Sequence, residues 1–148
     1  MGEIHDLRCS KCGYGIKAYL GIGMMYAPHM IFGENDPSLP DLIQDDKITS
    51  QALAKIKSGV NAKDNYEHAL YACPEDNYLF NKFYFELDDG SKPTYQCPYC
   101  QTTLQRVTFA KATGGVTKLK FVENPDSLWN CPHCGNSTLN EVAFANWD

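Results

Sequence analysis

The chain has 148 residues, of which 43% are hydrophobic and 21% are charged, and its formal net charge at pH 7 is −5. This balance is typical of a globular protein and argues against disorder along most of the chain. The negative net charge argues against a general attraction to nucleic acid or to an anionic membrane. No apolar run approaches the roughly 20 residues needed to span a bilayer, so no membrane partner is expected.

The first half of the chain alternates loop signals with β-prone and helical stretches. A cysteine turn precedes the apolar stretch 16–26, which predicts a strand that bends at its glycines. Residues 28–41 are rich in Pro, Gly, Asn and Asp and are expected to form a loop. The apolar spacing of residues 41–58 predicts a helix, with Asp41 as its N-cap and Gly59 as its C-terminal stop.

The second half of the chain is mostly β-prone. Alternating or apolar runs predict strands at 69–72, 80–87, 104–109, 117–122 and 139–147. A hairpin turn is expected at 112–115, where two adjacent glycines tolerate a positive φ. The pattern therefore predicts a small, β-rich α+β protein with one helical insert.

Seven cysteines are the most informative residues of the sequence. Six of them form three pairs with a spacing of two residues, and one stands alone: Cys9/Cys12, Cys97/Cys100, Cys131/Cys134 and Cys73. This spacing lets two thiolates of one tight turn face the same ion, and two such turns make a tetrahedral zinc site. The N-terminus lacks the pattern of a secretory signal, so we expect a cytoplasmic protein with thiolate ligands rather than disulfides.

The turns Cys9-Ser-Lys-Cys12-Gly13-Tyr14 and Cys131-Pro-His-Cys134-Gly135 resemble the knuckles of zinc-ribbon and rubredoxin-like proteins. The resemblance covers the cysteine turns and not the helical insert, and its nearest whole-chain likeness is to small bacterial proteins of unknown role. It implies a metal-bound fold in which strands and hairpins surround the knuckles. The expected organisation is a first ribbon-like half, 1–93, with the helical insert, and a second ribbon, 94–148.

Two pairings of the cysteines are consistent with the sequence. In the simpler pairing, neighbours along the chain form a four-thiolate zinc site: Cys97, Cys100, Cys131 and Cys134. In the crossed pairing, the first pair joins the last pair, as in rubredoxin, and the middle pair shares a site with Cys73. The crossed pairing stays open because the entropy cost of closing a loop rises only slowly with its length.

In the simpler pairing a second metal site would contain Cys9, Cys12 and Cys73 and would lack one ligand. Asp76 stands where a second knuckle cysteine would follow Cys73, and a carboxylate can ligate zinc at about 2.0–2.2 Å. The rival ligand is His68, five residues upstream of Cys73. A site completed by water, or a site without metal, is the third alternative. Iron in place of zinc would make the protein an electron carrier.

Basic residues gather in the range 90–122, which contains no acidic residue. If this segment bound nucleic acid, five basic side chains would contact phosphates while neighbouring aromatic rings stacked on bases. These side chains are Lys92, Arg106, Lys111, Lys118 and Lys120. Alternating lysines also solubilise an exposed strand face without any such role.

No nucleotide-binding or hydrolase motif is present, so an enzyme is not expected. The sequence Cys97-Pro-Tyr-Cys100 matches a glutaredoxin active site, but that chemistry needs the motif at the start of a helix. The predicted function is a zinc-binding, non-enzymatic interaction module whose metal organises a docking surface for another protein. The alternatives are a nucleic-acid-binding zinc ribbon and an iron-binding electron carrier.

Overall fold

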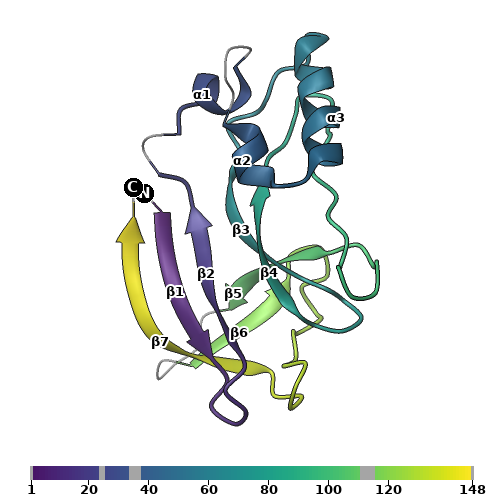
Figure 1. Ribbon diagram of the computed structural model, residues 1–148. Helices are drawn as coiled ribbons and strands as arrows, with labels where there is room; N and C mark the ends of the chain where they lie inside the picture. The colour runs from purple at the N-terminus through teal and green to yellow at the C-terminus, as the bar shows by residue number, and fades with distance from the viewer. Residues whose placement is uncertain (1, 24–25, 34–37, 111–115, 148) are drawn as a thin grey trace.

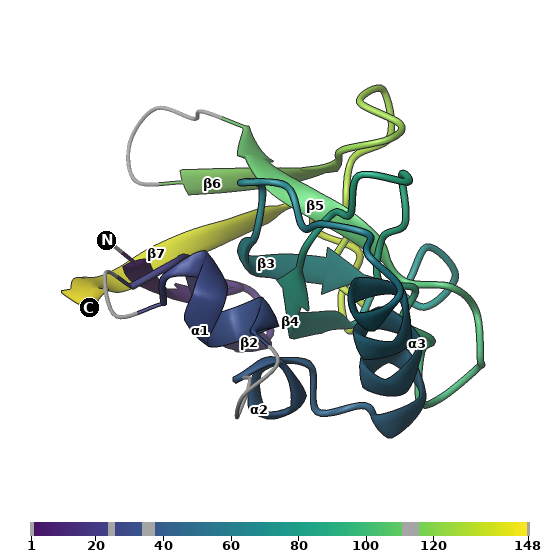
Figure 2. The same cartoon turned by 90° about the horizontal axis from the view of Figure 1, so that it is seen from above.

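The computed structural model describes residues 2–23, 26–33, 38–110 and 116–147, which form a curled antiparallel sheet with three short helices (Figure 1). The strands are β1 (Gly2–Arg8), β2 (Gly15–Gly21), β3 (Glu67–Ala72), β4 (Leu79–Tyr84), β5 (Gln105–Ala110), β6 (Val116–Phe121) and β7 (Thr138–Trp147). The helices are α1 (Pro28–Phe32), α2 (Leu39–Ile43) and α3 (Asp46–Lys57). Seen from above, the helices lie on one side of the molecule and the β5–β6 pair on the other (Figure 2).

The strands follow the order β2-β1-β7-β6-β5-β3-β4, and every pair is antiparallel. The first strand is therefore an interior strand that pairs with β2 on one side and with β7 on the other. Gly2 pairs with Trp147, which places the N- and C-terminal strands side by side (Figure 1). The sheet joins strands from both 1–93 and 94–148, and the division between these ranges stays a prediction.

The sheet curls because β2 also meets β3 through one residue pair, Gly21 with His68. The Asn81 side chain of β4 extends this contact. It accepts a hydrogen bond from the Tyr19 amide at 3.0 Å and donates one to the Lys17 carbonyl at 2.7 Å. A side chain thus satisfies backbone groups of β2 that would otherwise form an open edge.

Alternate residues of β3 face two separate hydrophobic cores. Leu70 and Ala72 point into the core inside the curled sheet, which also contains the fully buried Trp129. Ala69 and Tyr71 point the other way, into the core beneath the helices. The period of two in a strand explains how one short segment stabilises both cores.

The β-rich class is confirmed, and each range expected to be a strand contains one, although β2 ends at Gly21 and β4 at Tyr84, earlier than predicted. The helical region differs from the prediction. Helix α1 and the start of α2 lie in the range expected to be a loop. The single helix predicted for 41–58 is interrupted at Gln44, whose φ of 54° is left-handed. Asp45, not Asp41, caps α3, because its carboxylate accepts a hydrogen bond from the Ile48 amide at 3.0 Å. Gly59 follows α3 with a φ of 107°, a conformation that suits a helix end.

Strand β1 was not predicted, because the sequence at 2–8 mixes charged and apolar residues without strict alternation. Its neighbours on both sides, rather than its own pattern, make it a strand. The hairpin turn expected at 112–115 lies outside the described residues. None of the helices that the structure describes is long and apolar enough to cross a membrane.

Candidate metal centre

Four turns at one end of the sheet have the same backbone geometry. We call them knuckle 1 (9–14), knuckle 2 (73–78), knuckle 3 (97–102) and knuckle 4 (131–136). In each knuckle the amide of the first residue donates to the carbonyl of the sixth, at 2.7, 3.1, 2.8 and 2.7 Å respectively. The amide of the fifth residue donates to the carbonyl of the first, at 2.9, 2.8, 2.9 and 2.9 Å. The repeated pattern shows that knuckle 2 is built like the other three although it contains one cysteine.

The fifth residue of each knuckle has a positive φ, which the turn requires. Glycine takes this position in knuckles 1 and 4, where Gly13 and Gly135 both have a φ of 75°. Asn77 and Gln101 take it in knuckles 2 and 3, with φ values of 63° and 64°. Asparagine tolerates this region better than most residues, whereas glutamine is unusual there. Knuckles 2 and 3 therefore carry backbone strain that knuckles 1 and 4 avoid.

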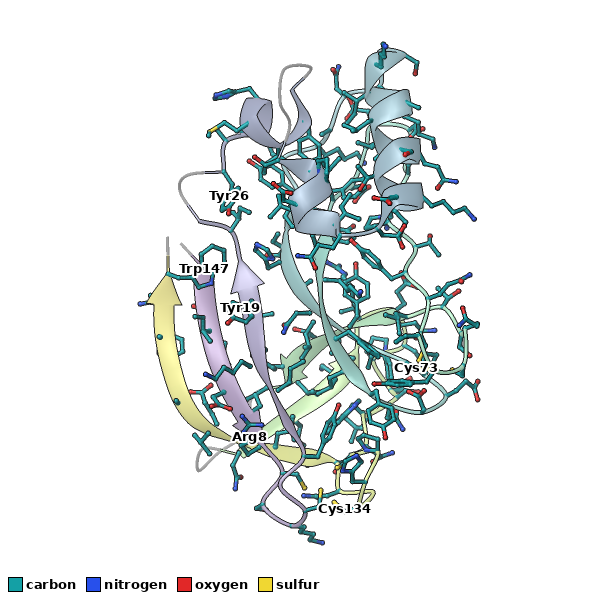
Figure 3. The ribbon with its side chains drawn as sticks, viewed as in Figure 1. Arg8, Tyr19, Tyr26, Cys73, Cys134 and Trp147 are labelled. Atoms are coloured by element: carbon teal, nitrogen blue, oxygen red, sulfur yellow. The ribbon has the colours of Figure 1, made fainter. Side chains whose placement is uncertain are left out.

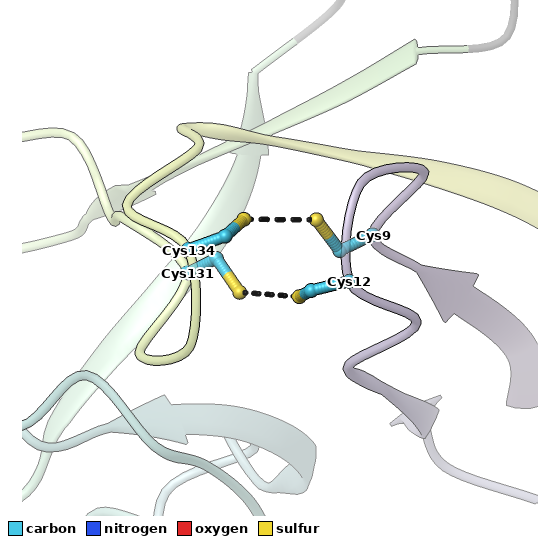
Figure 4. Close-up of side chains that lie close together, drawn as sticks. All are labelled: Cys9, Cys12, Cys131 and Cys134. Carbon is cyan, nitrogen blue, oxygen red and sulfur yellow. Dashed lines mark hydrogen bonds between the residues drawn. The ribbon is translucent and has the colours of Figure 1, made fainter.

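Knuckles 1 and 4 bring together the four-cysteine site, formed by Cys9, Cys12, Cys131 and Cys134. The Sγ atoms of Cys9 and Cys134 are 3.4 Å apart, as are those of Cys12 and Cys131 (Figure 4). Cys9 and Cys131 are buried at the edge of the core inside the curled sheet, and the other two cysteines are exposed. One side of the site thus faces the protein interior and the other faces solvent.

Knuckles 2 and 3 bring together the mixed site, formed by Cys73, Asp76, Cys97 and Cys100. The Sγ atoms of Cys73 and Cys100 are 3.4 Å apart, and the Cys97 thiol donates to Asp76 Oδ2 at 3.2 Å. Cys73 and Cys97 belong to the core beneath the helices. The two sites therefore border different cores. Both lie at the end of the sheet away from the helices, as the positions of Cys73 and Cys134 show (Figure 3).

The simpler pairing of neighbouring cysteines is wrong, and the crossed pairing is the one that the structure shows. Cys97 and Cys100 do not share a site with Cys131 and Cys134. The physical reason is strand order: β1 pairs with β7, so the turn after β1 meets the turn before β7. Likewise, β3 pairs with β5, so the turn after β3 meets the turn before β5.

Asp76 lies among the candidate ligand atoms, whereas His68 does not. The partners of Asp76 are Cys73, Cys97 and Cys100, so the predicted set in which it would complete Cys9, Cys12 and Cys73 is wrong. His68 lies on β3, which leads into knuckle 2, but five residues before Cys73, a separation of about 16 Å along an extended chain. Its ring instead packs against Phe83 and Trp147, with centroid distances of 5.5 and 5.3 Å. Burial lowers the pKa of His68, which favours a neutral imidazole.

The knuckle amides favour ionised thiols at selected positions. A hydrogen bond from the Lys11 amide is the main cause that lowers the pKa of Cys9 to about 6. Hydrogen bonding to the hydroxyl and then the amide of Thr102 also lowers the pKa of Cys100. Burial, in contrast, raises the pKa of Cys73 to about 12. Crowded thiols cannot all ionise without a cation, so each site combines activated thiolates with thiols that a metal ion would deprotonate.

Asp76 is held as a carboxylate facing the sulfurs. Burial on its own would raise its pKa, but a hydrogen bond from the Tyr78 amide and further ones from the neighbouring thiols outweigh this effect. The pKa of Asp76 is therefore lower than usual. An ionised carboxylate with one fixed oxygen and a second oxygen toward the thiols is suited to complete a set of four ligands.

The spacing of the donor atoms fits a tetrahedral ion. With sulfur ligands at about 2.3 Å, neighbouring sulfurs around zinc lie about 3.8 Å apart, whereas bonded disulfide sulfurs lie about 2.05 Å apart. The observed separations of 3.4 Å are close to the first value. In each site the four ligand atoms lie within 4.8 Å of one another. Both sites could therefore hold a metal ion.

The basic residues of 90–122 are placed only in part on one surface. By the strand register, Arg106 on β5 shares a face with Lys118 and Lys120 on β6. Arg106 lies over the ring of Tyr84, with 3.9 Å between the guanidinium carbon and the ring centroid. Lys92 lines a surface depression together with Arg106. Lys111 lies outside the described residues.

Sequence reasoning missed the aromatic rings that the knuckles bring together. Tyr14 and Tyr78 are the sixth residues of knuckles 1 and 2, while Tyr99 and His133 are the third residues of knuckles 3 and 4. Their ring centroids form contacts of 4.9 to 6.0 Å across the knuckles. Aligning the four turns by their first cysteine would have revealed the equivalent positions. Knuckle 3 leads into β5 and not into a helix, unlike the context that thiol–disulfide exchange needs.

No protein-family model matches this chain, and no curated protein or solved structure is significantly similar to it. The likeness to zinc ribbons therefore depends on the knuckles alone.

Proposed function

We propose that the protein is a zinc-binding, non-enzymatic interaction module of the cytoplasm, in which two structural zinc ions organise a docking surface for another protein. The observation that carries the proposal is the convergence of four equivalent knuckles on two sets of four ligand atoms. Thiolate-rich tetrahedral sets are those that zinc prefers in structural sites.

A structural role is favoured over a catalytic one by the number of protein ligands. Catalytic zinc keeps a position open for water or substrate, whereas each site here offers four protein ligands. Zinc in such sites contributes on the order of 10–16 kcal/mol of apparent binding free energy in small peptides at neutral pH. That contribution would add to the ring contacts and hydrogen bonds that already connect the knuckles.

The decisive experiment counts metal in the purified chain by mass spectrometry. The proposal expects two zinc ions per chain and no visible absorbance. Asp76→Ala should retain the ion of the four-cysteine site and lose the other to a weak chromophoric chelator. Asp41→Ala, which removes an exposed aspartate from α2, is the matched control and should retain both ions. Asp76→Cys should also retain both.

A chain without bound metal would refute the proposal. A red protein that contains iron would replace it with the electron-carrier alternative. If Asp76→Ala retained two tightly held ions, Asp76 would be excluded as a ligand while the proposal itself would stand.

A second candidate is nucleic-acid binding, favoured by the shared face of Arg106, Lys118 and Lys120. The test measures the affinity for a single-stranded oligonucleotide against salt concentration. The double variant Lys118→Ala, Lys120→Ala should lower the slope of log affinity against log salt by about 1.4 if both contact phosphate. Lys47→Ala, Lys57→Ala on α3 is the matched control. No binding by the unmodified protein would exclude this candidate.

A further inference from the structure

Rings from all four knuckles form one continuous row between the two sites. The ring centroids of Tyr14 and His133 are 4.9 Å apart, and those of His133 and Tyr78 are 5.9 Å apart. Tyr14 and Tyr78 also touch, at 6.0 Å, so these three rings are mutual neighbours at one end of the row. Tyr78 lies 5.1 Å from Tyr99, which in turn lies 6.3 Å from Phe80 on β4. We call these five residues the aromatic row. It connects knuckles that belong to different metal sites, so it spans the space between them.

The aromatic row has a fixed base and an exposed edge. Tyr14 stacks on the fully buried Trp129, and its hydroxyl accepts a hydrogen bond from the Leu79 amide at 3.0 Å. Tyr99 is 69% exposed, more than any other large hydrophobic side chain in the part of the chain that the structure describes. His133 is exposed as well. A rigid, partly exposed row of this kind presents binding area at a low cost in conformational entropy.

The charge beside the aromatic row favours a cationic partner. With a divalent ion bound, four thiolates carry a formal charge of −2, as do three thiolates with one carboxylate. Outside these ligand sets the four knuckles contain one basic side chain, Lys11, and one acidic side chain, Glu75, so their charges cancel. Aromatic faces attract ammonium and guanidinium groups, and the negative sites would strengthen that attraction. Phosphate groups would be repelled.

We infer that the aromatic row, at the end of the sheet where the knuckles meet, binds an arginine- or lysine-rich segment of a partner protein. The cationic side chains lie on the rings, and the two metal sites on either side supply the negative potential. This inference deepens the proposed function, because it rests on metal in both sites and names the chemistry of the docked protein.

The test measures binding of a fluorescein-labelled peptide of alternating arginine and glycine by fluorescence anisotropy. Tyr99→Leu removes the exposed ring and should weaken binding by about fivefold, while Tyr99→Phe should retain it. Tyr19→Leu removes an exposed tyrosine from β2 and is the matched control, which should bind as the unmodified protein does. A peptide of alternating glutamate and glycine should not bind.

The same samples are assayed for metal, so that the two proposals fail separately. Two ions per chain with no arginine-peptide binding, or with equal binding by Tyr99→Leu, would overturn the inference and leave the proposed function intact. A metal-free chain that does not bind would overturn both. Ring-dependent binding by a metal-free chain would refute the proposed function and the assigned source of the negative potential, and would leave only the contact between the rings and the cationic side chains. Tighter binding of an oligonucleotide than of the peptide at the row would also overturn the inference.

Discussion

The two candidate sites are built from the same turn but connect different parts of the chain. In the four-cysteine site, Cys12 and Cys131 are 119 residues apart, whereas Asp76 and Cys97 in the mixed site are 21 residues apart. The first site joins the turn after β1 to the turn before the last strand. The mixed site closes a local segment. The same turn geometry thus occurs in a site that closes a long loop and in a site that closes a short loop.

The two sites differ both in ligand chemistry and in the length of chain that they close. The four-cysteine site, which closes the longer loop, has a glycine at each positive-φ position. The mixed site, which closes the shorter loop, has a carboxylate ligand and two strained residues at those positions. Because the entropy of loop closure grows with loop length, closing the longer loop of the four-cysteine site costs about 1.5 kcal/mol more than closing the loop of the mixed site. A cross-link that overcomes the larger cost also removes more freedom from the unfolded chain. We therefore expect the four-cysteine site to matter more for global stability.

The largest effect is expected when both ions are removed. Exhaustive chelation should abolish cooperative folding, because the knuckles would lose on the order of 10 kcal/mol of metal binding. Near-ultraviolet circular dichroism reports the loss through the buried Trp129. If the metal-free protein kept its spectrum and its unfolding midpoint, metal would not stabilise the fold, and the two sites could not differ in their contribution to stability.

The next effect compares Cys131→Ser with Cys97→Ser. Both residues begin a Cys-Pro knuckle and both are buried, so each variant serves as the control for the other. Each should lose one ion, and Cys131→Ser should have a free energy of unfolding about 1.5 kcal/mol lower than that of Cys97→Ser. Urea titration measures the difference. The opposite order would show that the mixed site is the stronger cross-link.

A smaller effect is expected from Trp129→Phe, which tests whether the sites are coupled. The Trp129 indole N–H donates to the Asn77 carbonyl at 2.6 Å, so it joins knuckle 2 to the segment that leads from β6 into knuckle 4. The variant leaves this carbonyl without its donor and should cost about 2 kcal/mol. Zinc release from the two sites should also become independent. Unchanged release kinetics would show that the indole contributes packing alone.

The smallest effect concerns a salt bridge remote from both sites. Lys55 Nζ lies 3.2 Å from Asp89 Oδ2. Hydrogen bonds from Ser91, followed by the contact with Lys55, lower the pKa of Asp89 from 3.8 to about 2. A lowered carboxyl pKa contributes stability above about pH 4 that is lost as the pH falls toward 2. Asp89→Asn should slightly lower the urea midpoint at pH 7, because solvent screens the exposed carboxylate.

The difference in urea midpoint between Asp89→Asn and the unmodified protein should shrink as the pH falls below about 4, because the unmodified protein then also loses this charge. Both proteins should hold the same number of metal ions at pH 7. A change in metal content would show that this region and the knuckles are not independent.

The sequence predicted the parts of the molecule that depend on local pattern. The period of two identified most strands, and the spacing of cysteines identified six of the seven thiols that the structure brings into two sites. Asp76 was recognisable because it occupies the second ligand position of a Cys-Pro turn. These features depend on residues within one turn or one strand.

The features that the sequence did not predict depend on which strands are neighbours. The pairing of knuckles follows from the pairing of β1 with β7, and β1 itself carries a weak pattern. The small length dependence of closure entropy gave no means to choose between two pairings. The aromatic row was missed for the same reason, because its rings come from four separate turns. Strand order is a global property that no single segment encodes.

The position of β1 has a consequence for synthesis on the ribosome. The cysteines and the strand that complete the surroundings of knuckle 1, at 131–147, emerge more than a hundred residues after it. Knuckles 2 and 3 are separated by a short stretch and can capture their ion while the chain is still growing. Until residues 131–147 are made, the nascent protein therefore carries β1 with one edge unpaired and two thiols without their partner cysteines, and a chaperone or a free zinc pool would be needed most during that interval.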